Sequence, residues 1–183
     1  MIKIHRYFHE ILGENQKPIE LLFIFLFAVL STIFSFILYY DFLNNLPLLN
    51  QGILLLLTLD IAGGVIANLT YGTDQFYSKR KKARIVFIII HIQPILIFLF
   101  TNQPLWIGLI LWIYTIFCAI ILELLKKHSS QKVFAVFIFF IGLFILFLFQ
   151  SVLTAFVNFL IILYLFKVLY SFSVNHYHGV VNA

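Results

Sequence analysis

An aspartate stands in the middle of a strongly apolar stretch of this sequence, LDIAGGVIANLTYG, which runs from Leu59 to Gly72. A charged side chain at the centre of a membrane-spanning helix costs about 3 kcal/mol on insertion scales. Asp60 must therefore be neutralised, paired, hydrated or bound to a ligand. Ionisable groups inside a membrane mark ion pathways, proton relays and substrate sites, so Asp60 is the first candidate for chemistry.

The sequence HIQP offers a partner for Asp60. If the helices that carry them are antiparallel neighbours, His91 and Asp60 lie at similar depth in the membrane. Pro94 has no backbone N–H, which frees the carbonyl of Ile90 one turn earlier and predicts a kink. In a membrane that carbonyl must find another donor or face a wet cavity. The motif thus places a titratable ring beside a predicted kink.

Two asparagines extend this candidate polar centre. Asn158 is placed near mid-depth in the last apolar run, and Asn68 is placed closer to the cytoplasm. Together with Asp60 and His91 they could exchange a proton or hold a cation. A purely structural alternative stays open, in which a hydrogen bond between Asp60 and His91 only holds two helices together.

Small residues surround Asp60 on its helix. At 100° per residue, Asp60, Gly64 and Ala67 share one stripe, and Gly63 lies at its edge. Small residues at this spacing let a neighbouring backbone approach closely. We therefore expect the stripe to face the bundle interior, with Pro94 as a further helix-packing position.

Composition decides the fold class. The chain has 183 residues, of which 63% are hydrophobic and 10% are charged, and its mean hydropathy is +1.06. A soluble domain carries roughly 25% charged residues. The composition predicts an all-α, polytopic membrane protein with a single integral membrane domain over residues 1–183. The single cysteine, Cys118, excludes an internal disulfide framework.

Six runs approach the length of about 17–25 residues that a spanning helix needs. They cover residues 21–42, 52–71, 85–101, 105–125, 133–149 and 152–170. The last run requires Lys167 to extend toward the headgroups. Residues 1–19 are predicted to form a short amphipathic helix in the interface, because Ile4, Phe8 and Ile11 share one face. Residues 171–183 are predicted to be a cytoplasmic tail.

Basic residues predict the orientation. They gather in the second and fourth connections, and the other connections have none. Because basic loops stay in the cytoplasm, we expect a multi-pass protein of the cell membrane with both termini cytoplasmic. The basic residues of the second connection set this topology. A further role left open is binding of anionic lipid headgroups, at about 1 kcal/mol per charge. The basic residues of this connection are Lys79, Arg80, Lys81, Lys82 and Arg84.

Glu123 and Lys127 are predicted to form a surface ion pair, because they are four residues apart on one helix.

Known catalytic and cofactor motifs are not found. The sequence has no P-loop, no dinucleotide fingerprint, no Gly-x-Ser-x-Gly elbow and no HExxH. His5 and His9 are four residues apart, but this spacing alone does not predict a metal site. No metal site and no nucleic-acid partner are expected, the bilayer is the expected partner, and no cofactor is identified.

These observations favour a small transporter or an ion- or proton-handling protein with an intramembrane Asp/His centre. One alternative is a lipid-modifying enzyme that opens to the cytoplasmic leaflet past Asn68. That alternative lacks an identifiable nucleophile, and it has one intramembrane histidine where a catalytic zinc takes three protein ligands. A non-catalytic role as a membrane assembly partner, and a homo-oligomeric state, are left open.

Overall fold

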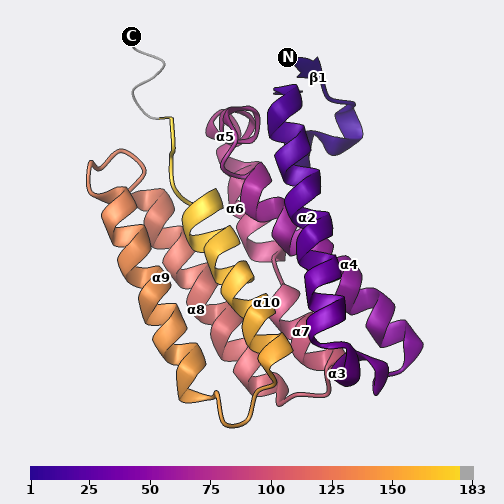
Figure 1. The fold of residues 1–183 in the computed structure, drawn as a ribbon. Coiled ribbons are helices and arrows are strands. Elements are labelled where there is room, and N and C mark those ends of the chain that lie inside the picture. The colour runs from indigo at the N-terminus through magenta and orange to yellow at the C-terminus, as the bar shows by residue number, and fades with distance from the viewer. Residues whose placement is uncertain (178–183) are drawn as a thin grey trace.

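The computed structural model describes residues 1–177, which form a bundle of helices standing side by side (Figure 1). Within these residues, six segments are long and apolar enough to cross a membrane. The predicted all-α, multi-pass fold is confirmed. The six segments are Pro18–Leu38, Leu48–Ala67, Lys81–Phe100, Leu105–Leu124, Gln131–Leu148 and Ala155–Phe172.

Several element bounds differ from the sequence-based ranges by a few residues. The described elements are β1 (Ile2–Lys3), η1 (Arg6–Phe8), α1 (His9–Leu12), β2 (Asn15–Gln16), α2 (Pro18–Leu38), α3 (Tyr40–Asn44), α4 (Leu48–Ala67), α5 (Tyr71–Ser78), α6 (Lys81–Ile90), α7 (Gln93–Phe100), α8 (Leu105–Leu124), α9 (Gln131–Leu148), α10 (Ala155–Leu165) and η2 (Phe166–Phe172). Helix α2 starts at Pro18, whose missing N–H is harmless in the first turn. Glu20 closes that turn by accepting the backbone N–H of Lys17 at 3.2 Å.

The N-terminal segment is more compact than the single interfacial helix predicted from its pattern. The antiparallel strands β1 and β2 pair with each other, and the 3₁₀ turn η1 and the four-residue helix α1 lie between them. Gly13 ends α1 with a φ of 70°, a conformation that glycine adopts without strain. A Cβ on Gly13 would overlap the carbonyl of Gly72, so this glycine also permits direct backbone contact with α5.

The two ends of the bundle differ in charge. One end carries the N-terminal segment, α5 and the connection between α8 and α9, and lies at the top of Figure 1. Every Lys and Arg except Lys167 belongs to this end, which we call the basic end. The opposite end carries α3 and the turns at residues 45–47, 101–104 and 149–154. The segregation of charge predicted from the sequence is therefore a property of the folded bundle.

The third spanning segment is broken in the middle. Helix α6 ends at Ile90 and α7 begins at Gln93, with His91 and Ile92 outside both helices. The carbonyl of Ile90 receives no hydrogen bond from Pro94, which has no backbone N–H. It accepts the N–H of Ile92 instead, at 2.8 Å. The kink predicted at HIQP is thus a complete interruption of the helix.

The sixth spanning segment is the most enclosed of the six. Buried residues make up 61% of it, against 22–39% in the other five. It begins as α10, where the Thr154 side chain accepts the N–H of Val157 at 3.4 Å. It ends as the π-helical segment η2, which contains Lys167. Wide π turns are rare and often occur at functional sites, and η2 packs against α4, α8 and α9.

Candidate intramembrane ion-pair site

A cavity of about 510 Å³ lies beside α4, between that helix and the broken segment α6–α7. Its volume falls in the range of about 300–1,000 Å³ that is usual for small-molecule sites. Polar side chains gather on one part of its wall and aliphatic side chains form much of the rest. The polar lining residues are Glu10, Asp60, Asn68, His91, Gln93 and Lys167.

An ion pair between Asp60 and Lys167 forms the centre of this site. The Nζ atom of Lys167 lies 3.0 Å from Oδ2 of Asp60 and 3.4 Å from its backbone carbonyl. The lysine side chain is 3% exposed, whereas the aspartate side chain is 51% exposed. The pair is therefore asymmetric, with an enclosed cation and a carboxylate that is open to the cavity. Lys167 does not extend to the headgroups, which corrects the sequence-based reading of this residue.

Gly64 makes room for the lysine. A Cβ at this position would overlap Cε of Lys167 and lie 2.9 Å from Nζ and 3.0 Å from Cδ. The absence of a side chain at Gly64 therefore lets the lysine reach Asp60, one turn away on the same helix. Gly63 instead faces α2, where its Cβ would lie 3.4 Å from Cβ of Ala28, and Ala67 is buried. The small-residue stripe thus serves both helix packing and the ion pair.

The beginning of α7 supplies a second donor to the carboxylate. Nε2 of Gln93 donates to Oδ2 of Asp60 at 2.6 Å. Among residues 1–177, the side-chain donors that reach this carboxylate both end on Oδ2. Oδ1 is thereby left free of protein donors within that part of the chain. Gln93 is 9% exposed, and its own carbonyl oxygen Oε1 is buried without a protein partner in the described residues.

His91 lines the same cavity as Asp60, but no hydrogen bond joins the two among the described residues. The imidazole instead bonds through Nδ1 to the carbonyl of Phe87, which the helix break leaves available. The backbone carbonyl of His91 accepts the hydroxyl of Tyr164 at 3.1 Å. His91 therefore fixes the geometry of the break, while Lys167 is the direct partner of Asp60.

The two predicted asparagines separate in space. Asn68 lines the cavity toward the basic end, is 4% exposed, and has a buried Nδ2 without a protein partner in residues 1–177. Asn158 is not among the lining residues of the cavity. Because α10 begins at Ala155, Asn158 lies in the first turn of that helix rather than at mid-depth. Its segment contributes Lys167 to the cavity instead.

Helix α1 covers the cavity at the basic end. Glu10 and Ile11 belong to its lining, and Tyr77 of α5 donates its hydroxyl to the carbonyl of Glu10 at 2.8 Å. Burial, reinforced by the nearby charge of Glu10, raises the pKa of the Tyr77 hydroxyl. This hydroxyl therefore stays protonated and keeps donating at physiological pH. The N-terminal segment is part of the site, although its sequence pattern predicted only an interfacial helix.

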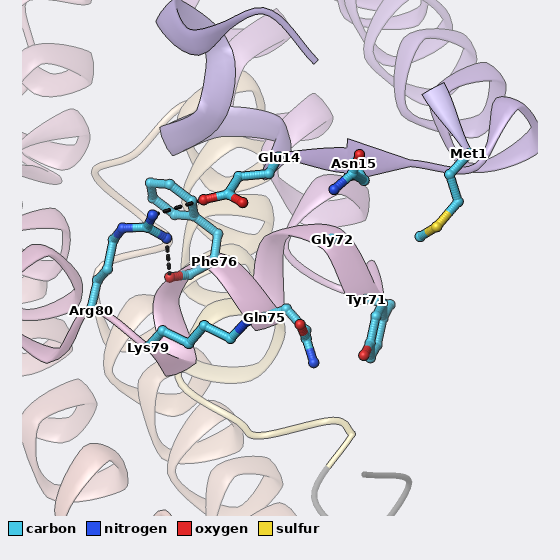
Figure 2. Close-up of a pocket in the computed structure, with 9 residues that line it drawn as sticks. All are labelled: Met1, Glu14, Asn15, Tyr71, Gly72, Gln75, Phe76, Lys79 and Arg80. Atoms are coloured by element: carbon cyan, nitrogen blue, oxygen red, sulfur yellow. Dashed lines mark hydrogen bonds and ion pairs between the residues drawn. The ribbon is translucent and has the colours of Figure 1, made fainter. Parts of the chain in front are cut away.

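Figure 2 shows how the same segment is fastened to α5. Nη2 of Arg80 lies 2.7 Å from Oε1 of Glu14, and Nη1 donates to the carbonyl of Phe76 at 3.2 Å. The guanidinium also lies 4.1 Å from the centre of the Phe76 ring. The pocket that these residues line is small, about 70 Å³. We read this contact as the attachment of the cover and not as a ligand site.

A second buried ion pair lies near the basic end. Nε of Arg84 is 2.8 Å from Oε2 of Glu123, and Nη2 donates to the carbonyl of Phe172 at 2.7 Å. Both side chains are buried, at 1% and 8% exposure. Glu123 also lies 3.5 Å from Lys126, so its partners are Arg84 and Lys126 and not the predicted Lys127. Arg84 is enclosed and does not face lipid headgroups.

The residues after η2 pack against the bundle as far as they are described. The Gln131 side chain donates to the carbonyl of Ser173 at 3.0 Å and accepts the N–H of Asn175 at 3.0 Å. Burial lowers the pKa of His176, although its ring bonds to backbone carbonyls. Burial also raises the pKa of Asp74 on α5, against the attraction of Arg84. Residues 178–183 of the predicted tail lie outside the described residues.

Sequence reasoning placed Asp60 and His91 in one site but missed Lys167 and Gln93. One signal for Lys167 was available, since it is the one Lys or Arg inside a predicted apolar run, and such a charge needs an acid if it does not reach the headgroups. Chemically, the cavity offers an enclosed ammonium, a carboxylate with one oxygen that has no donor in the described residues, and two amide atoms that are unpaired there. Within residues 1–177, no group of three or more His, Cys, Asp or Glu side chains is arranged to hold a metal ion.

Comparison with known proteins found no family model that matches this chain, no matching curated protein and no matching solved structure.

Proposed function

We propose that this chain is a small membrane transporter that exchanges a cation for a proton at the Asp60–Lys167 pair. The observation that carries the proposal is the asymmetry of the pair, in which the ammonium is 3% exposed and the carboxylate is 51% exposed. A cation in the cavity can reach Asp60 without first displacing the protein around it. Lys167, in contrast, has no comparable access to solvent.

The exchange follows from the cost of an unpaired buried charge. A cation that binds Asp60 takes over the charge compensation that Lys167 supplied. An enclosed ammonium without its counter-ion is strongly unfavourable, so Lys167 releases its proton to the cavity and becomes a neutral amine. The pair plus the cation then has the same net charge as the original pair. The membrane interior therefore contains no uncompensated charge before or after the exchange.

The break between α6 and α7 supplies a hinge for alternating access. Discontinuous helices place irregular backbone at substrate sites in many transporters, and hinges are a few residues at element ends. Gln93 opens α7 and bonds directly to Asp60 at 2.6 Å. Movement of α7 is thereby coupled to the state of the carboxylate. His91 serves as the fixed pivot through its bonds to Phe87 and Tyr164.

We assign the basic end to the cytoplasm, because loops rich in Lys and Arg are retained there. Both termini are then cytoplasmic, and the cell membrane is the natural location. Lys79, Lys81 and Lys82 are placed to contact anionic headgroups, at about 1 kcal/mol each. The cavity then lies nearer the cytoplasmic leaflet, because Asp60 is seven residues, or about 10 Å, from the basic end of α4.

A lipid-modifying enzyme is the second candidate. The observation in its favour is that the apolar wall of the cavity is exposed at the flank of the bundle, with Leu56 at 68% and Ile90 at 58% exposure. A neutral Lys167 would be its nucleophile. It ranks below the transporter, because in the described residues the lysine is enclosed by protein and ion-paired.

The test uses purified protein in proteoliposomes that contain a pH-sensitive dye. Addition of Na⁺, K⁺ or an organic cation outside should change the internal pH with the wild-type protein. Asp60→Asn and Lys167→Gln should each abolish the change, because either variant removes one half of the exchange. Asp41→Asn, which alters an exposed acid on α3 in the same way, should leave it intact.

Two results would count against the proposal. Cation-dependent proton movement that persists in a correctly folded Lys167→Gln protein would show that the lysine is not the proton donor. Hydrolysis or modification of lipid by the wild-type protein, lost in Lys167→Gln, would favour the enzyme instead.

A further inference from the structure

The cavity limits the chemical class of the transported cation, and this inference rests on the proposed function. Besides its polar residues, the cavity is lined by aliphatic side chains and one aromatic ring. They include Ile11, Leu56, Ile90, Ile92 and Leu96. A small hydrated ion gains nothing from such a wall. A ligand with a sizeable apolar body buries it against these side chains.

The position of the wall indicates where the ligand enters. Leu56, Ile90 and Ile92 are 68%, 58% and 41% exposed, and all three lie within the spanning segments. At this depth exposed aliphatic side chains face hydrocarbon. At the basic end, Glu10 and Ile11 of α1 cover the cavity. Entry from the bilayer is therefore more direct than entry from water, which requires a ligand that dissolves in lipid.

The charge of the lining selects the sign of the ligand. The lining contains two carboxylates, Asp60 and Glu10, and one ammonium, Lys167, which gives a net charge of −1 when His91 is neutral. Oδ1 of Asp60 has no protein donor within residues 1–177, and Oε1 of Gln93 is a buried acceptor without a protein partner there. These groups accept hydrogen bonds or attract positive charge.

We infer that the ligand of this cavity is an amphiphilic organic cation, such as a hydrophobic amine or a quaternary ammonium or phosphonium ion, that enters from the bilayer. Its apolar body lies along Leu56 and Ile90, and its charged centre lies at Asp60 in place of Lys167. Glu10, at the covered end, contributes a second negative charge that favours cations over anions of the same shape.

The experiment compares tetraphenylphosphonium with tetraphenylborate, which are similar in size and shape and opposite in charge. Equilibrium binding is measured to protein in nanodiscs of neutral phospholipid, with empty nanodiscs subtracted. The phosphonium ion should bind saturably and at least about ten-fold more tightly than the borate, since ionic attraction to a carboxylate at close range in a weakly polar site is worth at least about that factor. Asp60→Asn should weaken its binding by about ten-fold, and Asp41→Asn should not.

A second variant protects the test against misfolding of Asp60→Asn. Leu96→Trp keeps every charged group and enlarges a half-buried side chain of the cavity wall, so it should also weaken phosphonium binding. Tighter binding of the borate would overturn the inference and assign the site to an anion at Lys167. Phosphonium binding that is unchanged in either variant would overturn it as well.

Proton release measured in the same samples separates the two proposals. Phosphonium binding without proton release would leave the ligand class standing and refute the exchange. Proton release by Na⁺ or K⁺ without phosphonium binding would refute the ligand class and leave the exchange standing.

Discussion

Replacing Gly64 by alanine should disrupt the ion pair without touching either charged residue. The added Cβ would overlap Cε of Lys167 and lie 2.9 Å from Nζ and 3.0 Å from Cδ. The lysine side chain is 3% exposed and cannot move aside into solvent. It must therefore leave Asp60 or push α4 away from η2. Either response weakens the contact that joins the second and sixth spanning segments.

The size of the effect follows from three contributions. Overpacking of a well-packed site costs about 1–3 kcal/mol. Loss of the ion pair adds about 1 kcal/mol, a low figure because the exposed Asp60 side chain is screened. Alanine returns up to about 1 kcal/mol through its better helix propensity. The free energy of unfolding should therefore fall by about 1–3 kcal/mol, taken as the sum of these contributions.

The neighbouring glycine provides a matched control. A Cβ on Gly63 would meet Cβ of Ala28 at 3.4 Å, which is an ordinary contact. Gly63→Ala should therefore be neutral or stabilising. Both variants are unfolded by increasing dodecyl sulfate in mixed micelles and followed by far-ultraviolet circular dichroism. Equal stabilities of the two variants would refute the reasoning. In a Lys167→Ala background, the cost of Gly64→Ala should disappear, because the clashing atoms are gone.

Three further predictions concern the basic end, and a fourth concerns the topology. Burial raises the pKa of Asp74, so the ionised carboxylate opposes folding at pH values above its ordinary pKa of 3.8. Asp74→Asn should therefore raise the melting temperature at pH 7 but not near pH 4. Burial lowers the pKa of His176 from 6.5, so the stability of the protein should fall as the pH drops below that value. In a series of melting temperatures from pH 7 to 5, His176→Gln should show a smaller decrease than the wild type. Arg84→Ala leaves the buried carboxylate of Glu123 with only its longer contact to Lys126 at 3.5 Å and should cost about 3 kcal/mol, the low end for a broken buried pair, in the same detergent unfolding assay. Reporter fusions at Asn102 and Ser130 should read outside and inside, and the reverse result would invert the topology.

Hydropathy alone was enough to predict the six spanning segments, because apolar length is a one-dimensional property of the chain. The break at His91 was also predictable, since proline removes a specific backbone donor. The docked N-terminal segment was not, because its pattern suits an interfacial helix equally well. Its actual structure depends on contact between Gly13 and the backbone of Gly72, nearly sixty residues later.

The site was predicted only in part, and Lys167 explains why. A lysine one turn from the end of an apolar run is ordinarily assumed to extend to the headgroups. Two features that direct it inward are invisible to that rule. One is the π-helical segment η2, which changes the direction of side chains relative to an α-helix. The other is Gly64, which reads as a packing residue until the neighbouring helix is placed beside it.

Arg84 and Glu123 were missed for a different reason. Each was assigned a local role, as a lipid-facing charge and as the partner of Lys127 on the same helix. Their pairing depends on the rotation of α6 and α8 about their own axes. Neither charge count nor helical spacing contains that information.

The distance along the chain between Asp60 and Lys167 means that the two halves of the ion pair are synthesised at different times. The two residues are 107 positions apart. At a synthesis rate of about 5–20 residues per second, Asp60 is made about 5–20 s before its partner exists. During that interval α4 is tolerated in the bilayer, because each of its leucines favours insertion by roughly 0.5 kcal/mol. Together they offset the roughly 3 kcal/mol by which the aspartate opposes insertion. Every newly made chain therefore passes through a stage in which a carboxyl group stands in the bilayer without a cation, and the last helix to emerge is the one that ends it.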